Sequence, residues 1–305
     1  MDHEYYKRVS PLLDVGRLTS LRIVVIGLRS GGADIAVEFG RLGVSLFLTD
    51  LADEKIEGHN VIRHVLGAGA LGRIKHEAMA EHIRNLNPAA AVLSAGFDAV
   101  ADLDTMAAAL KDFSPHLIFA ATDNEESKFA IDSVGREQGI TVVGGGVYDG
   151  GVGGEVYVSD GGGACYGCIT RFIRGTKRPR AAQRRHDYSS VDLPELRATA
   201  ALKLDIAQIA SICVRFGLQR LLSPDQDRFG VLKGANLAIF ANHRVPGIFE
   251  RPLSAQFFAV TPQAQCLVCA PASEQTSPTR SLSRADSPSE SASPFPHEEP
   301  TGATP

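Results

Sequence analysis

The feature that most constrains this chain is a strand, a glycine-rich turn, a helix and a second strand in direct succession. The apolar run 21–26 leads into the turn 27–32, and the apolar residues of 33–42 suit a buried helix. A second apolar run, 44–49, is closed by Asp50, about 20 residues beyond the turn, where dinucleotide-type sites place an acid that binds ribose. This order predicts a βαβ unit with two parallel strands.

The alternation of strands and helices continues beyond this unit. The apolar spacing predicts helices over 72–86 and 102–112, and strands over 90–97 and 116–122. Strands that alternate with helices indicate a parallel sheet that is covered by helices on both faces.

From residue 141 onward the pattern changes. The runs 142–147 and 154–158 are separated by a short glycine-rich stretch, which suits an antiparallel connection. A long helix is predicted over 195–222, followed by extended stretches over 236–240 and 254–260. We therefore expect an α/β fold with a Rossmann-like doubly wound sheet, parallel at first and mixed or antiparallel later.

Composition limits the class of protein and its partners. The chain is 44% hydrophobic and 22% charged, which is typical of a globular protein, and its net charge of −4 provides no overall attraction to nucleic acid or an anionic membrane. Its first residues, Met-Asp-His-Glu, do not resemble a secretory signal, and no apolar run approaches the roughly 18 residues of a membrane span. We expect a cytoplasmic protein without a membrane or nucleic-acid partner.

The C-terminal residues 271–305 differ from the rest of the chain. They contain eight serines and seven prolines. Such a segment cannot bury a core, so it is predicted to be a disordered tail.

Four of the five cysteines form two Cys-x-x-Cys pairs, Cys165 with Cys168 and Cys266 with Cys269. In a reducing compartment this pattern favours a tetrahedral zinc site, with a redox pair or an iron–sulfur cluster as the alternatives. A closed zinc site would tie the C-terminal segment to the sheet. The fifth cysteine, Cys213, lies on an apolar helical stripe, which is typical of an inert core thiol.

The glycine turn itself leaves its ligand open. Glycines in a strand-to-helix turn let backbone N–H groups approach a phosphate, so ATP and NAD both fit. Arg29 stands where the Gly-x-Gly-x-x-Gly pattern has its middle glycine, which leaves Gly27, Gly31 and Gly32. The Arg29 side chain could crowd a phosphate or pair with it. A turn that only packs helix against strand is the alternative.

Four further motifs follow the turn in order: Asn-Val-Ile-Arg-His at 60–64, Gly-Arg-Ile-Lys at 72–75, Asn-Pro at 87–88 and Ala-Thr-Asp-Asn at 121–124. Together with the turn, this ordered set resembles the ThiF/MoeB adenylyltransferases, which share a fold with the ubiquitin-activating enzymes. The resemblance spans residues 6–269.

The resemblance implies a site for ATP and Mg²⁺. Arg63, Lys75 and Asp123 would be its catalytic residues, because negative charge develops on the pyrophosphate leaving group. Asp50 would bind the ribose. The implied nucleotide-binding residues are Gly27, Arg29, Gly31, Gly32, Asp50, Asn60, Arg63, Lys75, Asp123 and Asn124.

The resemblance also implies a reaction. The protein would activate the C-terminal carboxylate of a small ubiquitin-like or ThiS-like carrier as an acyl-adenylate and release pyrophosphate, with ATP, Mg²⁺ and a structural Zn²⁺ as cofactors. In a domain over 1–270, residues 20–150 would bind the nucleotide and 151–270 the carrier and the zinc. The glycines of 150–154 would leave a channel for the carrier tail. The family forms homodimers, in which Arg8 of one subunit would reach the phosphates of the other.

Other interpretations stay open. The stretch 171–194, where covalent relatives carry a cysteine, contains none, which favours adenylation alone. Arg29 also resembles the non-catalytic halves of eukaryotic ubiquitin-activating enzymes, which would make the chain an impaired scaffold or a partner-binding module. A third interpretation, that the chain is an NAD-linked oxidoreductase, is supported by the βαβ unit alone. The seven Lys and Arg residues of 171–186 predict a solvated loop, with a docking surface for an acidic protein as the alternative.

Overall fold

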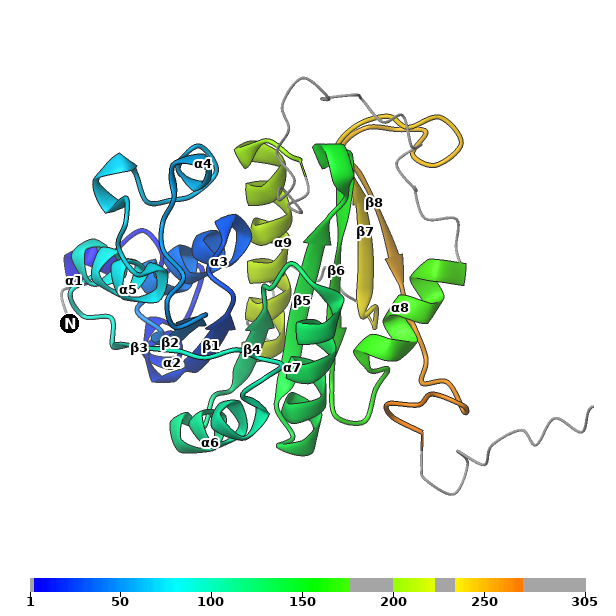
Figure 1. The fold of residues 1–305 in the computed structure, drawn as a ribbon, viewed down its shortest axis with the longest axis horizontal. Helices are drawn as coiled ribbons and strands as arrows, with labels where there is room; N and C mark the ends of the chain where they lie inside the picture. Colours follow the sequence, from blue (N-terminus) through cyan, green and yellow to red (C-terminus); the bar gives the residue numbers. More distant parts are fainter. Residues whose placement is uncertain (1–2, 176–199, 223–233, 271–305) are drawn as a thin grey trace, which may run out of the picture.

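The computed structural model describes residues 3–175, 200–222 and 234–270. The described residues form one eight-stranded sheet flanked by helices (Figure 1). The predicted disordered tail and the first residues of the predicted helix 195–222 lie outside the described residues.

The strand order is β3-β2-β1-β4-β5-β6-β7-β8. Strands β3, β2, β1, β4 and β5 are parallel, whereas β6, β7 and β8 each run antiparallel to the strand before them. The prediction of an α/β sheet that is parallel first and antiparallel later is therefore confirmed. The strands are β1 Arg22–Ile26, β2 Ser45–Asp50, β3 Val92–Gly96, β4 Leu117–Ala120, β5 Thr141–Val147, β6 Gly153–Ser159, β7 Leu237–Ala241 and β8 Ser254–Phe258.

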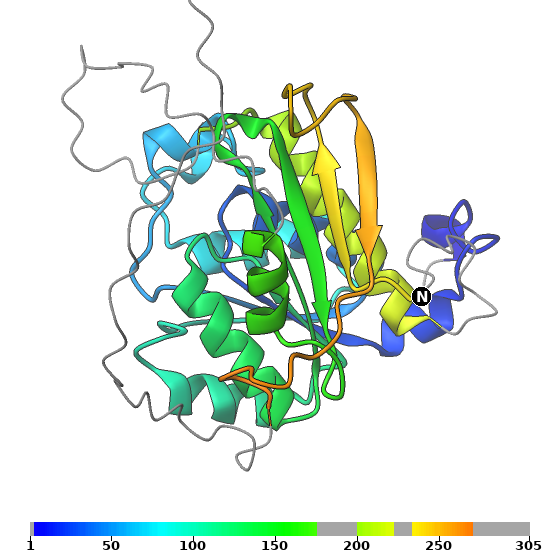
Figure 2. The same ribbon diagram turned by 90° about the vertical axis from the view of Figure 1, so that its right-hand side faces the viewer.

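The sheet lies between two layers of helices (Figures 1 and 2). Helices α3, α5 and α9 pack on one face, α6 and α7 on the other, and α8 covers the antiparallel strands. The helices are α1 His3–Tyr6, α2 Val15–Ser20, α3 Ser30–Arg41, α4 Gly58–Val61, α5 Lys75–Leu86, α6 Leu103–Phe113, α7 Glu125–Glu137, α8 Tyr166–Gly175 and α9 Lys203–Leu221. None of these helices is both long and apolar enough to cross a membrane.

The central strand β1 shows why an apolar run forms such a sheet. Ile23 and Val25 point into the core under α3 and α9, and Val24 and Ile26 point into the core under α6 and α7. Because successive strand residues face opposite sides, a strand that is covered on both faces is apolar throughout.

Several predicted boundaries differ from the observed ones, and the structure gives the cause of three of these differences. Helix α5 begins at Lys75 rather than 72, because Gly72 has a positive φ of 77° and donates to the Ile56 carbonyl. Helix α9 begins at Lys203, where Leu202 is extended and Asp205 accepts its backbone N–H.

The third correction concerns the predicted basic loop. Residues up to Gly175 form the last turns of α8, because Ile169 and Ile173, four positions apart, are buried against β6 and β7. The rest of that predicted loop lies outside the described residues.

Candidate active site

The turn between β1 and α3 has a backbone that only glycine allows. Gly27 has a φ of +90°, and a Cβ on Gly32 would lie 1.9 Å from the Gly27 carbonyl oxygen. The first N–H bonded within α3 is that of Ala33, which donates to the Arg29 carbonyl. The N–H groups of the preceding turn therefore need partners from outside the helix, which makes this helix start suited to a phosphate.

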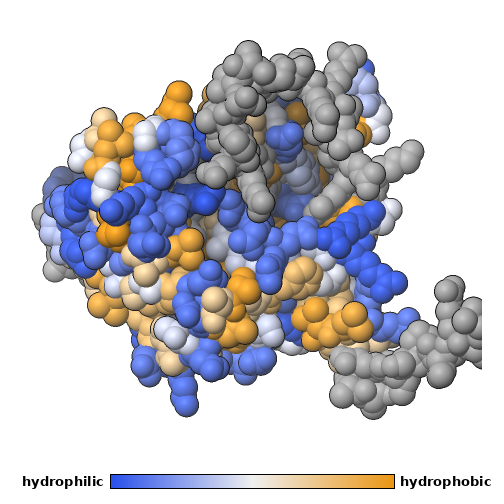
Figure 3. Space-filling view, in the orientation of Figure 1, coloured by the Kyte–Doolittle hydropathy of each residue, from blue (hydrophilic) through white to orange (hydrophobic). Residues whose placement is uncertain are grey.

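A cavity of about 520 Å³ opens at this turn. It lies at the carboxyl ends of β1, β4 and β5, where the strand order reverses and where open α/β sheets bind ligands. Figure 3 shows hydrophilic residues around α4, whose His59 and Asn60 line the cavity. The predicted residues that line the cavity are Arg29, Gly31, Gly32, Asn60, Arg63, Lys75 and Asp123.

Three predicted residues are placed differently. Among the described residues that line the cavity, Gly27, Asp50 and Asn124 do not appear. Asp50 accepts the Leu28 N–H at 2.7 Å and the Leu51 N–H at 2.9 Å, so its carboxylate holds the glycine turn against the end of β2.

Asn124 serves as the N-cap of α7. Its side-chain oxygen accepts the Ser127 backbone N–H at 2.7 Å and the Ser127 hydroxyl at 2.6 Å. The cap starts α7 directly after Asp123 and so leaves the Asp123 carboxylate at the cavity.

Arg8 is exposed and is not among the described residues that line this cavity.

Lys75 is the buried cation of the site. Its side chain is 1% exposed, and its Nζ lies 2.8 Å from Glu54 Oε1 and 3.9 Å from Asp50 Oδ2. Burial alone would raise the pKa of Glu54, but the hydrogen bond and the attraction of Lys75 outweigh it and lower that pKa. Sequence reasoning missed Glu54, because nothing in its local pattern pairs it with a residue 21 positions away.

Arg29 projects from the glycine turn and forms two ion pairs. Its Nη1 lies 2.7 Å from Asp123 Oδ2, and its Nη2 lies 3.8 Å from Glu54 Oε1. The substituted glycine position therefore links Asp123, which lines the cavity, to Glu54, the partner of Lys75.

His64 fixes the glycine turn from the other side. The Leu66 backbone N–H donates to His64 Nδ1 at 3.1 Å, so Nε2 carries the proton and donates to the Leu28 carbonyl at 2.8 Å. Burial lowers the pKa of His64 and favours this neutral form. Its neighbour His59 also lines the cavity and pairs with Glu57.

The opposite end of the cavity holds residues that the motif analysis did not single out. Lys128 from α7 donates to the Gly145 carbonyl at 2.7 Å, and the Tyr148 hydroxyl donates to Glu155 Oε2 at 2.7 Å. Burial lowers the pKa of Lys128, opposed by the nearby Glu155. Cys213 of α9 lies beside them in the core, and burial raises its pKa to about 12.

The glycines of 150–154 do not form the predicted channel. A Cβ on Gly153 would lie 2.1 Å from the Phe240 carbonyl oxygen, and one on Gly154 would lie 2.5 Å from the Gly146 carbonyl oxygen. These glycines let neighbouring strands and α9 pack closely, so the space is filled.

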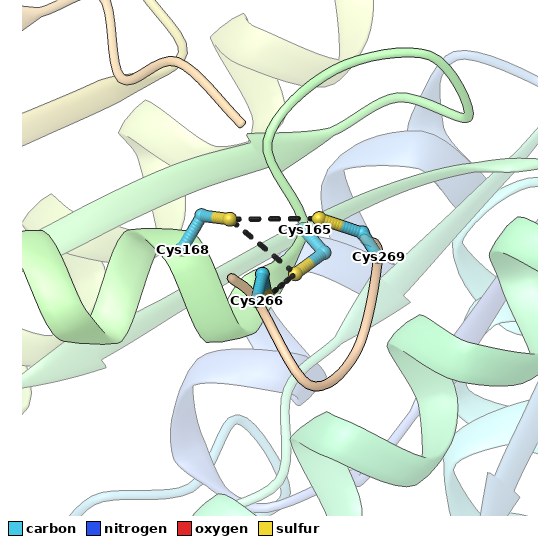
Figure 4. Close-up of side chains that lie close together, drawn as sticks. All are labelled: Cys165, Cys168, Cys266 and Cys269. Atoms are coloured by element: carbon cyan, nitrogen blue, oxygen red, sulfur yellow. Dashed lines mark hydrogen bonds between the residues drawn. The ribbon is translucent and has the colours of Figure 1, made fainter. Parts of the chain in front are cut away.

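The two Cys-x-x-Cys pairs meet in space, as Figure 4 shows. The four sulfur atoms all lie within 4.8 Å of one another, including 3.4 Å between Cys165 and Cys266 and 3.6 Å between Cys168 and Cys269. Sulfurs about 2.3 Å from a tetrahedral zinc would lie roughly 3.8 Å apart, so the cluster fits one such ion. Burial raises the pKa of Cys165 and of Cys168, and a bound cation would favour their thiolates.

The fold and the cavity define an α/β protein with a glycine turn at the switch point of its sheet. This turn between β1 and α3 is called the phosphate-type turn, because such turns commonly bind phosphate. The family model for the ThiF family matches residues 8–248, and the chain belongs to that family.

Solved structures show the same fold. Escherichia coli MccB with AMPCPP and selenomethionine MccA has a TM-score of 0.65 at 14% identity, covering 88% of this chain and 75% of that one. MccB with ATP has a TM-score of 0.63 at 13% identity, covering 88% and 75%. Selenomethionine PaaA has a TM-score of 0.60 at 17% identity, covering 84% and 82%. Among curated protein sequences, none matches this chain significantly.

Proposed function

We propose that this protein binds ATP with Mg²⁺ in the cavity and transfers AMP to a carboxylate. The observation that carries the proposal is the convergence of Arg63, Lys75 and Asp123 with the phosphate-type turn on one cavity. Membership of the ThiF family and the likeness to MccB, whose structures contain ATP and MccA, support it.

The proposed reaction follows from the charged residues at the end of the cavity that adjoins the glycine turn, here called the phosphate end. A substrate carboxylate oxygen forms a bond to the α-phosphorus while the bond to the bridging oxygen breaks, and the electron pair leaves with pyrophosphate. Arg63 and Lys75 stabilise the charge that develops there. The Nζ of Lys75 is fixed by Glu54 at 2.8 Å, on a side chain that lines the cavity. Asp123 would hold Mg²⁺, which supplies further positive charge when bound.

We propose that the acyl substrate enters at the other end of the cavity. Lys128 is a buried amine there, and a carboxylate can accept a hydrogen bond from it, whereas an apolar group cannot. The substrate class is the C-terminal carboxylate of a peptide or of a ubiquitin-like or ThiS-like carrier. With its raised pKa, Cys213 is protonated at neutral pH, so the product is an adenylate rather than a thioester.

The other elements of the proposal concern the whole chain. We propose a structural zinc at the four clustered cysteines, a cytoplasmic homodimer with Arg8 at the partner's site, and one domain over 1–270. In that domain 20–150 would bind nucleotide, and 151–270 the carrier and zinc.

The test is exchange of labelled pyrophosphate into ATP with a panel of peptides and small carriers that end in glycine. We expect exchange with a cognate carboxylate and a loss of at least about 100-fold for Asp123→Ala, which removes the proposed magnesium ligand. Arg73→Met is a matched control, because Arg73 pairs with Glu81 and does not line the cavity. If wild type shows no saturable heat with ATP and Mg²⁺ in calorimetry, the proposal is wrong.

One observation favours a second candidate. The ion pair between Arg29 and Asp123 occupies the carboxylate proposed for Mg²⁺, as an impaired scaffold would allow. The same calorimetric titration separates the two, since a scaffold gives no saturable heat.

A further inference from the structure

We propose that Arg29 exchanges partners when nucleotide binds: it leaves Asp123, pairs with a phosphate, and so releases Asp123 for Mg²⁺. This inference rests on the proposed function. It concerns the position where the glycine pattern of the turn is broken.

The first step is that Arg29 can leave Asp123. The side chains of Arg29 and Asp123 are 48% and 53% exposed, and the second contact, to Glu54, is a longer 3.8 Å. Exposed ion pairs contribute little because water screens both charges. A triphosphate, with several negative charges, competes well for the guanidinium.

The second step is that a phosphate at the turn lies near Arg29. Arg29 is the N-cap of α3, its own side chain makes no capping bond, and its φ of −68° is ordinary. Its guanidinium and the N–H groups of the helix start therefore belong to one short segment that lines the cavity. Guanidinium groups bind phosphate through two parallel N–H donors, as they bind carboxylate, so the exchange replaces one anionic partner of Arg29 by another.

The third step is that Arg29 and Mg²⁺ exclude each other at Asp123. Two cations on one carboxylate repel each other, so a guanidinium 2.7 Å from Asp123 Oδ2 disfavours a divalent ion there. Glu54 keeps its hydrogen bond to Lys75 in either state, so it stays neutralised when Arg29 moves. Nucleotide binding should therefore strengthen Mg²⁺ binding, and Mg²⁺ binding should strengthen nucleotide binding to the same degree.

The experiment is calorimetry of ATP binding in EDTA, followed by the same titration with Mg²⁺. We expect Arg29→Met to weaken Mg²⁺-free ATP binding at least about tenfold, since one charge-assisted phosphate contact is lost, and to leave adenosine binding unchanged. Arg29→Lys should recover part of the loss. Arg73→Met, which breaks a comparably exposed pair outside the cavity, should bind ATP like wild type. Circular dichroism confirms that each variant is folded.

A double-mutant cycle tests the exchange itself. Asp123→Asn should strengthen Mg²⁺-free ATP binding more in the wild-type background than in the Arg29→Met background, because only the former has an ion pair to break. If Arg29 stays on Asp123 in the complex, the order is reversed. Tighter or unchanged ATP binding by Arg29→Met overturns the inference while leaving the proposed function intact. Absence of ATP binding by wild type overturns the proposed function first.

Discussion

At the scale of single residues, the site contains a cation, Lys75, that is almost completely buried at the cavity wall. Lys75 is held by Glu54 and, at longer range, by Asp50, and Asp50 in turn holds the glycine turn. Removing a partner from a buried charge is costly, because the remaining charge is left in a medium of low polarity. The Lys75 environment therefore affects folding and, if the proposed function holds, phosphate binding as well.

We predict that Glu54→Gln lowers the free energy of unfolding by about 2 kcal/mol at pH 7, since Asp50 keeps part of the pairing. The pKa of Glu54 is lower in the folded protein than its ordinary value of 4.5. The contribution of its charge is therefore complete above about pH 4.5 and is lost as the pH falls through the folded pKa.

Urea denaturation of wild type and variant from pH 7 down to about pH 3, which spans the range below 4.5 where the contribution is lost, checks this. The difference between them should shrink toward the acidic end. Glu81→Gln, at the exposed pair with Arg73, is the control and should leave stability unchanged. A difference for Glu54→Gln that grows with acidity would contradict the assignment.

At the scale of elements, the turn and α3 act as one unit. The end of β1 and the start of α3 approach so closely that Gly32 lies against the backbone of Gly27. Asp50 and His64 then hold the turn from β2 and from the segment after α4. Such close packing explains why this turn is rich in glycine.

We predict that Gly32→Ala destabilises the protein by about 3 kcal/mol or more, because its Cβ would meet a carbonyl oxygen at 1.9 Å. Gly31→Ala is the matched control: its Cβ would meet only Ile206 Cγ2, at an ordinary 3.6 Å. Thermal denaturation of both variants measures the difference. Equal stability of the two would show that the turn opens more easily than this geometry allows.

At the scale of the whole molecule, distant parts of the chain build one site. Helix α9, which comes after most of the sheet in sequence, packs on α3 and contributes Ile206, Ile209 and Cys213 to the cavity. The cysteine cluster similarly joins the start of α8 to the segment after β8. The C-terminal segment is thus brought against the start of α8.

We predict that the purified protein carries one zinc per chain, and that Cys269→Ser loses it. If zinc is present at about 100 times its dissociation constant, it stabilises the fold by about 2.7 kcal/mol, and its loss lowers the melting temperature by roughly 5–10 °C. Metal analysis and thermal denaturation measure both effects. Cys213→Ala should keep its zinc, because Cys213 is outside the cluster. Full zinc content in Cys269→Ser would contradict a four-cysteine site.

The elements of the parallel half could be predicted because their signals are local. Apolar runs that are buried on both faces, such as β1, and the glycines of the turn are legible within a few residues. The start of α9 could not be placed from the sequence. It is fixed by the hydrogen bond from the Leu202 backbone N–H to Asp205, a contact that the apolar pattern does not contain. The channel predicted at 150–154 was wrong for the same reason: whether glycines leave space depends on what packs against them.

The sequence alone determined the order of strands and helices, the phosphate-type turn and the two cysteine pairs, because each depends on neighbours along the chain. Only the tertiary structure decided which charges meet. Arg29 pairs with Asp123 across 94 positions, and Lys75 with Glu54 across 21, because the sheet order brings the ends of β1, β2 and β4 together. Coulomb attraction acts over a few ångströms of space and is indifferent to sequence separation, so no local pattern records it.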